Sequence, residues 1–406
     1  MNIQYAPRSG IVDVLIMDIA RRIQLPPSSY RVATDRYETM ARHLQRPESP
    51  MSNAIVRLYG QGSVSIGAVI SSKFDNDEFD VDAIVELAIP ADAPPALVLD
   101  NLFVAINGKP ESRYHGKTVR HSRCVTVEYD EMHIDFTPAV LHPSLAERTS
   151  TIFHANQNEV ASAHYHKVAN PWGFAEWFKL HTPRLDAFAK SFVQDAAEPL
   201  PEPAQLSEKS LPLQALQLLK RWRNKCFNTR KRMRMPPSVV LAYFTAALPG
   251  HRSSLFGELL AQARNLLQFF ESIDRTGRLV RILNPACPLD VLTDRWPGSQ
   301  TEQHLFISDL QMLVTELEAL CDQPTIAECQ LAFGRLFGER AAQDAVNDYA
   351  ARHKESAHAG RVHHHLGTGA IALGQSGLAA RSYGSTAVAP TARHTDFGSP
   401  VESEKP

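Results

Sequence analysis

The sequence predicts an α+β protein with two lobes: a mixed sheet with helices, followed by a helical C-terminal lobe. Three observations support this fold class. Period-two alternation of apolar residues recurs between about residues 55 and 140, and helical spacing dominates from about 210 to 352. The chain of 406 residues is also longer than a single hydrophobic core usually serves.

The first elements are two helices and a strand. Residues 10–24 carry apolar positions at helical spacing and stop before two prolines, and residues 29–46 read as a second helix. The stretch from Asp80 to Leu87 then alternates as a strand, with its core face formed by Val81, Ala83, Val85 and Leu87. Asp80 and Asp82 consequently share the opposite face.

A predicted hairpin supplies the next acidic residue. Residues 124–129 and 132–136 form two short strands around an Asp130-Glu131 turn. Alternation in the second strand places His133 and Asp135 on one face. We therefore expect Asp135 to join Asp80 and Asp82.

The rest of the chain divides into a helix, a linker, a helical lobe and a tail. Asn170 has the position of a helix N-cap, with Pro171 as the first helical residue. The polar segment 183–207, which contains prolines, is expected to link the lobes, and the following lobe to be all-helical. We assign residues 1–190 to the sheet-containing lobe with its N-terminal helices, 191–352 to the helical lobe, and 353–406 to a low-complexity, mostly disordered tail.

Composition excludes several classes of protein. The net charge of −2 disfavours stable, nonspecific DNA or RNA binding, which needs a large basic excess. The five cysteines are scattered, as expected of a reduced, cytoplasmic protein: Cys124, Cys226, Cys287, Cys321 and Cys329. The N-terminus lacks a secretory pattern and the chain has no run of 18 apolar residues, so we expect neither secretion nor membrane association.

The three aspartates Asp80, Asp82 and Asp135 predict a metal site. Mg²⁺ prefers carboxylate and phosphate oxygens, and three carboxylates with a triphosphate suit two ions; Mn²⁺ is a possible substitute. An isolated Asp-x-Asp pair is also typical of a solvated strand face. The preceding Gly62-Ser63 turn favours the metal interpretation, because glycine lets backbone amides approach a phosphate and serine adds a hydroxyl donor.

This order of motifs, Gly62-Ser63, then Asp80-x-Asp82, then Ile134-Asp135-x-x-Pro138-Ala139, resembles the polymerase-beta-like nucleotidyltransferase superfamily. It resembles more closely the bacterial CD-NTases (SMODS type), the cyclic-oligonucleotide synthases of CBASS anti-phage systems and relatives of cyclic GMP-AMP synthase. The resemblance spans about residues 55 to 300 and includes segments 170–178, 218–224, 236–241, 284–285 and 294–296. It departs at Gly67-Ala68, where many relatives have Gly-Thr.

The resemblance implies roles for seven residues. Gly62 and Ser63 would cradle phosphates, the three aspartates would bind Mg²⁺, and Lys220 and Ser238 would hold the donor triphosphate. From the sequence alone, helix 210–227 buries Ala215, Leu218, Leu219, Trp222 and Cys226. Lys220 and Arg223 then lie on a neighbouring face, where basic residues are ordinarily solvated. The resemblance implies that Lys220 alone points into the cleft between the lobes instead.

Two alternatives remain for the next helix. Ser238 follows two prolines and has the sequence of an N-cap, a role compatible with anion binding at a helix N-terminus. Tyr243 fits a core position better than a base-stacking one.

The implied activity is condensation of nucleoside triphosphates, ATP expected among them, into a cyclic di- or trinucleotide with release of pyrophosphate. Asp135 would lie nearest the attacking hydroxyl. Relatives are regulated by HORMA-domain proteins or a ubiquitin-transfer-like machinery, so a protein partner is conceivable. The residues leave open a linear oligonucleotide or tailing nucleotidyltransferase and a non-catalytic nucleotide-sensing module, together with base identity, ring size and linkage.

Overall fold

The computed structural model describes residues 10–71, 79–182, 198, 200, 206, 209–228, 230, 233–250, 252–358, 362–365, 371–373 and 388–390. The chain divides into two compact units, Met1–Ala342 and Gln343–Pro406. The first unit holds the predicted sheet lobe and the predicted helical lobe up to Ala342, and the second unit is described by itself below.

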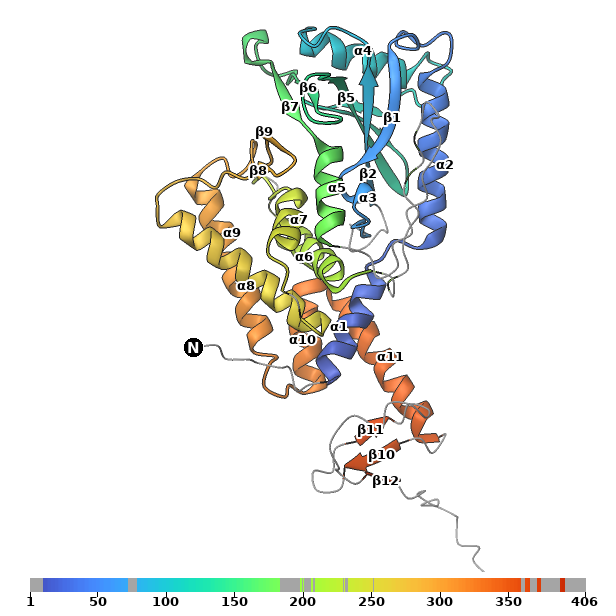
Figure 1. Ribbon diagram of the computed structural model, residues 1–406. Helices are drawn as coiled ribbons and strands as arrows, with labels where there is room; N and C mark the ends of the chain where they lie inside the picture. The colour runs from blue at the N-terminus through green and yellow to red at the C-terminus, as the bar shows by residue number, and fades with distance from the viewer. Residues whose placement is uncertain are drawn as a thin grey trace, which may run out of the picture. The chain divides into compact units, whose positions relative to one another are not determined.

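The sheet lobe is built on seven strands among the described residues (Figure 1). The central strand β2 (Phe79–Leu87) pairs in antiparallel fashion with β1 (Ile55–Gln61) and in parallel with β5 (Met132–Leu141). Beyond β5 the sheet divides into two branches: β4 (Val125–Glu128) with β3 (Thr118–Arg120), and β6 (Ser150–His154) with β7 (Tyr165–Ala169).

The two faces of β2 have different environments. The alternating residues Val81, Ala83, Val85 and Leu87 pack into the main core with helices α2 (Pro27–Leu44) and α4 (Pro95–Asn107), as predicted. Ile84 lies on the opposite face in a smaller apolar cluster with Ala139, Ile152 and Ala169. This second face carries Asp80 and Asp82, so the predicted strand orientation is confirmed.

Helix α5 (Pro171–His181) continues from β7 and lies between the sheet and helices α6 and α7 (Figure 1). The Asn170 side chain accepts a 2.6 Å hydrogen bond from the Gly173 amide, which confirms the predicted cap. The short helix α3 (Gly62–Ser65) follows β1, and a 3₁₀ turn, η1 (Ala161–Ala163), precedes β7.

The helical lobe contains α6 (Leu211–Phe227), α7 (Ser238–Ala247), α8 (Leu255–Asp274), α9 (Gln300–Glu318) and α10 (Ile326–Phe337). Trp222 is buried as predicted, with its ring centroid 6.1 Å from that of Phe306. Helix α1 (Gly10–Arg22) packs against α8 and α10 in this lobe rather than in the sheet lobe to which we assigned it. Its buried stripe, Val12, Leu15, Ile16 and Ile19, explains the placement.

The prediction of an all-helical second lobe was wrong. A hairpin of β8 (Leu283–Asn284) and β9 (Cys287–Val291) interrupts it. Sequence analysis missed these strands because they are short, contain prolines and show no clear alternation. Among the described residues, no helix is sufficiently long and apolar to span a membrane.

The predicted tail boundary at residue 353 does not match the secondary structure. Helix α11 (Glu339–His358) continues past it, since alanine and charged residues favour a helix without an apolar period. Three short strands in the second unit, β10 (Val362–His365), β11 (Ile371–Leu373) and β12 (Val388–Pro390), form an antiparallel sheet. The disorder predicted for the remaining tail, and most of the predicted linker 183–207, lie outside the described residues.

Candidate active site

Two aspartates lie side by side on neighbouring strands at the centre of the sheet. The parallel register of β2 and β5 places Asp82 directly beside Asp135. The Thr126 hydroxyl on β4 donates a 2.5 Å hydrogen bond to Asp135 Oδ1 and fixes that carboxylate. Burial, then the charges of Asp135 and Asp80, raise the pKa of Asp82 to about 7, while Lys220 acts in the opposite direction. The pair therefore forms a concentrated negative site.

Asp80 has a more exposed position on the same strand. It lies two residues before Asp82, opposite His133 of β5, and is solvent-exposed. Within the described part of the chain, no three acidic, histidine or cysteine side chains are grouped closely enough to hold a metal ion. The three predicted aspartates thus lie on one face of the sheet and close enough for the charges of Asp80 and Asp135 to act on Asp82, but they do not form a preformed metal cage.

Gly62 is held tightly against the Asp82 carboxylate. It has a φ of 61°, a left-handed conformation that suits glycine, and a Cβ atom at this position would overlap Asp82 Oδ2. The preceding residue, Gln61, is the register partner of Asp82 on β1. The Gly62-Ser63 turn and the aspartate strand therefore have a fixed mutual position.

The basic run on α6 is buried, contrary to the prediction that Arg223 lies on a solvated face. Lys220, Arg221 and Arg223 are only 6%, 7% and 6% exposed. Their charged groups donate to backbone carbonyls: Lys220 Nζ to Ala68 O at 2.7 Å, Arg221 Nη1 to Ser71 O at 3.2 Å, and Arg223 Nη1 to Pro236 O at 3.0 Å. The apolar stripe of the helix correctly predicted one buried face. The face that carries the basic residues is buried as well, because neighbouring segments of the chain cover it with their backbone carbonyls.

Burial and mutual repulsion weaken the charge of these cations. Burial, then Arg223, lowers the pKa of Lys220 to about 7, against the favourable charges of Asp82 and Asp80. Burial lowers the pKa of Arg223 to about 10, and Asp80 opposes that shift. Lys220 alone among them lines the cavity described next, so an incoming polyanion would meet a cation that is already desolvated.

One cavity of about 280 Å³ brings most predicted site residues together. Its lining includes five of the seven: Gly62, Ser63, Asp82, Lys220 and Ser238. Its walls come from both lobes, with β1, β2, β5, β6 and β7 on one side and α6, α7 and the β8–β9 hairpin on the other. Asp80 and Asp135 are not in this lining.

The predicted N-cap role of Ser238 was wrong. Ser238 is the first residue of α7, Pro237 occupies the cap position, and no side-chain hydrogen bond caps the helix. The Ser238 side chain instead contributes to the cavity wall. The Tyr243 ring stacks on Trp177 at 5.7 Å, in agreement with the core interpretation.

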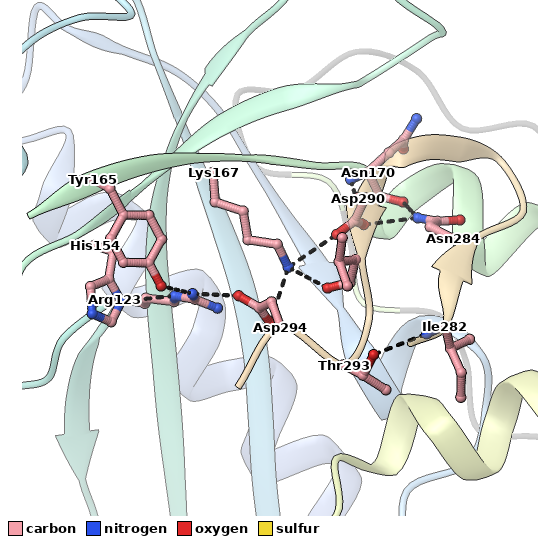
Figure 2. Close-up of polar contacts among 11 residues, drawn as sticks. Arg123, His154, Tyr165, Lys167, Asn170, Ile282, Asn284, Asp290, Thr293 and Asp294 are labelled. Atoms are coloured by element: carbon pink, nitrogen blue, oxygen red, sulfur yellow. Dashed lines mark hydrogen bonds and ion pairs between the residues drawn. The ribbon is translucent and has the colours of Figure 1, made fainter. Parts of the chain in front are cut away.

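The polar lining residues that sequence reasoning missed include a group at the lobe junction: Arg123, Lys167, Asn284 and Asp290. Figure 2 shows that they meet where β7 contacts the β8–β9 hairpin. Asn284 belongs to a segment that carries the family resemblance, which was an available signal. Arg123 and Lys167 are single basic residues near strand starts, and nothing in their local sequence distinguishes them from surface residues.

Comparison with known proteins places the chain in a family. A family model for the Second Messenger Oligonucleotide or Dinucleotide Synthetase domain (SMODS) matches residues 16–180. The chain is 34% identical over 328 residues to the cyclic dinucleotide synthase CdnG of Bradyrhizobium diazoefficiens, with 77% of each chain covered. The chain belongs to the CD-NTase family.

Other CD-NTase comparisons agree with this assignment. The structure of Bradyrhizobium diazoefficiens CdnG in complex with GTP superimposes with a TM-score of 0.69 at 31% identity, over 84% of this chain and 99% of that one. A c-di-GMP synthase of Roseivirga ehrenbergii is 23% identical, with 79% of this chain and 82% of that protein covered. The Escherichia coli MS115-1 CdnC:HORMA-deltaN complex shares the fold, with a TM-score of 0.50 at 16% identity over 80% of this chain and 96% of that chain. CD-NTase membership confirms the predicted α+β fold and the nucleotidyltransferase class.

The position of Lys220 in the cavity lining leads to a specific prediction. Lys220→Met keeps most of the side-chain volume but removes the charge, so we expect the KM for nucleoside triphosphate to rise at least about tenfold, equivalent to about 1.4 kcal/mol. Because a buried cation is itself costly to desolvate, melting temperature should change little. Steady-state kinetics and thermal unfolding measure the two effects.

Gln217→Met is a matched control for this experiment. Gln217 lies one helical turn before Lys220 and donates a 2.8 Å hydrogen bond to the neighbouring carbonyl, Val69 O, but carries no charge. If Lys220 acts only by tethering the 66–71 segment, both variants will weaken nucleotide binding equally. A charge role requires a distinctly larger effect from Lys220→Met.

Proposed function

We propose that this CD-NTase condenses nucleoside triphosphates, GTP among them, into a cyclic dinucleotide and releases pyrophosphate. One observation carries the proposal: a single cavity between the lobes presents Asp82, the Gly62-Ser63 turn, Lys220 and Ser238 together. Two relatives named for cyclic dinucleotide synthesis favour this product over the trinucleotide left open by the sequence. Participation of ATP stays a prediction.

The carboxylates fit a divalent cation supplied with the nucleotide. Asp82 and Asp135 lie side by side, and burial, then the charge of Asp135, raises the pKa of Asp82, a cost that a bound cation relieves. Their oxygen donors suit Mg²⁺, which commonly takes one or two carboxylates, waters and substrate phosphates, so a complete protein cage is unnecessary. When bound, Mg²⁺ would neutralise triphosphate charge and favour ionisation of the attacking hydroxyl.

The remaining residues position the substrate. The Gly62-Ser63 turn offers backbone amides and a hydroxyl to phosphate oxygens, at a distance fixed by the contact of Gly62 with Asp82. Lys220 and Ser238 reach the same cavity from the helical lobe and would hold the triphosphate between the lobes. Such catalysis depends on alignment and charge neutralisation rather than on a covalent enzyme intermediate.

Product analysis tests the proposal. The purified full chain is incubated with Mg²⁺ and with GTP, ATP or both, and pyrophosphate release and product mass are measured. We expect a phosphatase-resistant cyclic dinucleotide that contains guanine. A phosphatase-sensitive chain as the end product would indicate a linear nucleotidyltransferase, and nucleotide binding without pyrophosphate release would indicate a sensing module.

We further propose that the product acts in cytoplasmic anti-phage (CBASS) signalling and that a protein partner regulates its synthesis. Family membership supports the signalling role, and the HORMA complex of Escherichia coli CdnC provides a candidate class of partner. Phage protection by the intact gene cluster, and its loss when Asp80 and Asp82 are replaced, would test the role in cells. A ubiquitin-transfer-like partner is the alternative. Deleting the gene for either partner and measuring phage protection distinguishes the two.

A further inference from the structure

Polar side chains join the two lobes where β7 and the start of β4 meet the β8–β9 hairpin (Figure 2). Arg123 Nη2 lies 2.5 Å from Asp294 Oδ2. Lys167 Nζ lies 3.1 Å from Asp290 Oδ1, 3.4 Å from Asp294 Oδ1 and 3.0 Å from Val291 O. Each cation comes from the sheet lobe, and each acceptor comes from the helical lobe.

The network has a fully buried inner part. Asn170, Asn284 and Asp290 are 1%, 1% and 4% exposed. The backbone N–H of Asn170 donates to Asp290 Oδ2 at 3.1 Å. The side-chain Nδ2 of Asn284 donates to both Asn170 O and Asp290 Oδ2 at 2.9 Å. Because buried polar groups are costly to separate, this inner cluster acts as a permanent attachment.

The outer part is more accessible to water. The side chains of Arg123, Lys167 and Asp294 are 14%, 15% and 22% exposed. Burial alone would raise the pKa of Asp294, but hydrogen bonding to Arg123 and the charge of Lys167 hold the pKa below its usual value, so the carboxylate is ionised at neutral pH. Ion pairs of this intermediate exposure are weaker than buried ones and can open reversibly. We call Arg123, Lys167 and Asp294 the latch.

Lys167 of the latch lies well away from the paired aspartates along the sheet. On β5, Ala139 is four residues beyond Asp135 and pairs with Ile152 of β6, which in turn pairs with Lys167 of β7. Four residues along a strand and two strands across correspond to roughly 15 Å. The cavity wall is partly apolar, with Ile84 and Ile152. Arg123 and Lys167 line the cavity.

We propose that the latch retains the linear intermediate in the cavity until ring closure. This inference rests on the proposed cyclic synthesis, which needs two condensations. In the first, a 3′- or 2′-hydroxyl of one nucleotide attacks the α-phosphorus of another and pyrophosphate leaves. In the second, the free hydroxyl of that linear dinucleotide attacks its own α-phosphorus, and a second pyrophosphate leaves. The intermediate must be repositioned between these steps without escaping.

The latch is suited to this task by its position and strength. It joins the two lobes beside the cavity, and its Lys167 lies away from the aspartates, so we assign it an effect on the escape of the intermediate rather than on phosphoryl transfer. The inner cluster keeps the lobes attached while the outer ion pairs open to release the cyclic product. Asp294 itself is not in the cavity lining and acts only through Arg123 and Lys167, which makes it a positioning residue.

The test is the ratio of linear to cyclic product in Asp294→Asn. The purified full chain receives Mg²⁺ and GTP, and mass spectrometry quantifies the linear dinucleotide triphosphate and the ring. We expect the linear fraction to rise at least about fivefold, while the rate of the first pyrophosphate release falls less than about threefold. The swap Arg123→Asp with Asp294→Arg should lower the linear fraction again, because it restores the ion pair with reversed direction.

Glu318→Gln is the matched control. Glu318 Oε1 accepts hydrogen bonds from both Nη2 and Nε of Arg264, at 2.7 and 2.9 Å, within the helical lobe and outside the cavity lining. Its product ratio should equal that of the wild type. If Asp294→Asn lowers the melting temperature but leaves the ratio unchanged, the latch is only structural and the inference is wrong.

If Asp294→Asn fails to fold, Arg123→Gln provides the second variant, since it removes the charge that pairs with Asp294. An unchanged product ratio in folded Arg123→Gln would equally overturn the inference. Absence of any cyclic product from the wild type would instead contradict the proposed function, so the two failures are distinguishable.

Discussion

Asp80→Ala combined with Asp82→Ala is expected to abolish nucleotide condensation and to leave the protein folded. Product formation should fall at least about 1000-fold, equivalent to about 4 kcal/mol of activation free energy, because the cation and triphosphate lose their carboxylates. The metal-free fold should not suffer, since Asp135, Asp80 and burial already disfavour the charged form of Asp82. Pyrophosphate release and thermal unfolding measure the two effects.

Asp92→Ala is the control for nonspecific loss of negative charge. Asp92 is exposed and lies in the loop between β2 and α4, outside the cavity lining. Its activity should match that of the wild type. Asp135→Asn should approach the loss seen in the double variant, since its carboxylate lies beside Asp82. Continued synthesis in the double variant would reject the assignment of these aspartates.

Gly62→Ala is expected to have the second-largest effect on activity. An added Cβ would collide with the Asp82 carboxylate, so either the phosphate-binding turn or the aspartate must move. We expect activity to fall about 100-fold, since displacements near 1 Å in reacting groups have effects of that size. The left-handed backbone should add a stability loss of about 1–2 kcal/mol.

Gly116→Ala separates these two contributions. Gly116 also has a left-handed conformation, with a φ of 77°, but a Cβ there would meet no atom within 4 Å. It should lose a similar amount of stability and keep activity within about twofold. Equal activity losses in both variants would mean that backbone strain, rather than contact with Asp82, explains the result at Gly62.

The sequence predicted best those features that depend on local periodicity. Alternation in Phe79–Leu87 correctly assigned both faces of the central strand, because that strand is buried by helices on one side and faces the cavity on the other. The Asn170-Pro171 start signal likewise depends only on neighbouring residues. The proximity of Asp82 and Asp135 followed from motif order and was verified by strand register.

Features that depend on long-range contacts could not be predicted in this way. Lys220, Arg221 and Arg223 are buried because carbonyls at residues 68, 71, 236 and 337 come to them, and no pattern within the helix records those partners. The Arg123–Asp294 pair spans 171 residues of sequence. Helix α1 reaches the helical lobe for the same reason, since its apolar stripe does not specify its partner.

The buried cations of α6 have a consequence for the choice of polyanion. Lys220 is the one of the three that lines the cavity, so in a protein with a net charge of −2 its positive charge acts inside the cavity rather than over the surface. A ligand must enter a space of about 280 Å³ to experience that charge. The triphosphate end of a nucleotide can enter such a space, whereas a nucleic acid duplex cannot. The size of the cavity thus selects among anions, because it admits nucleotide phosphates and excludes nucleic acids.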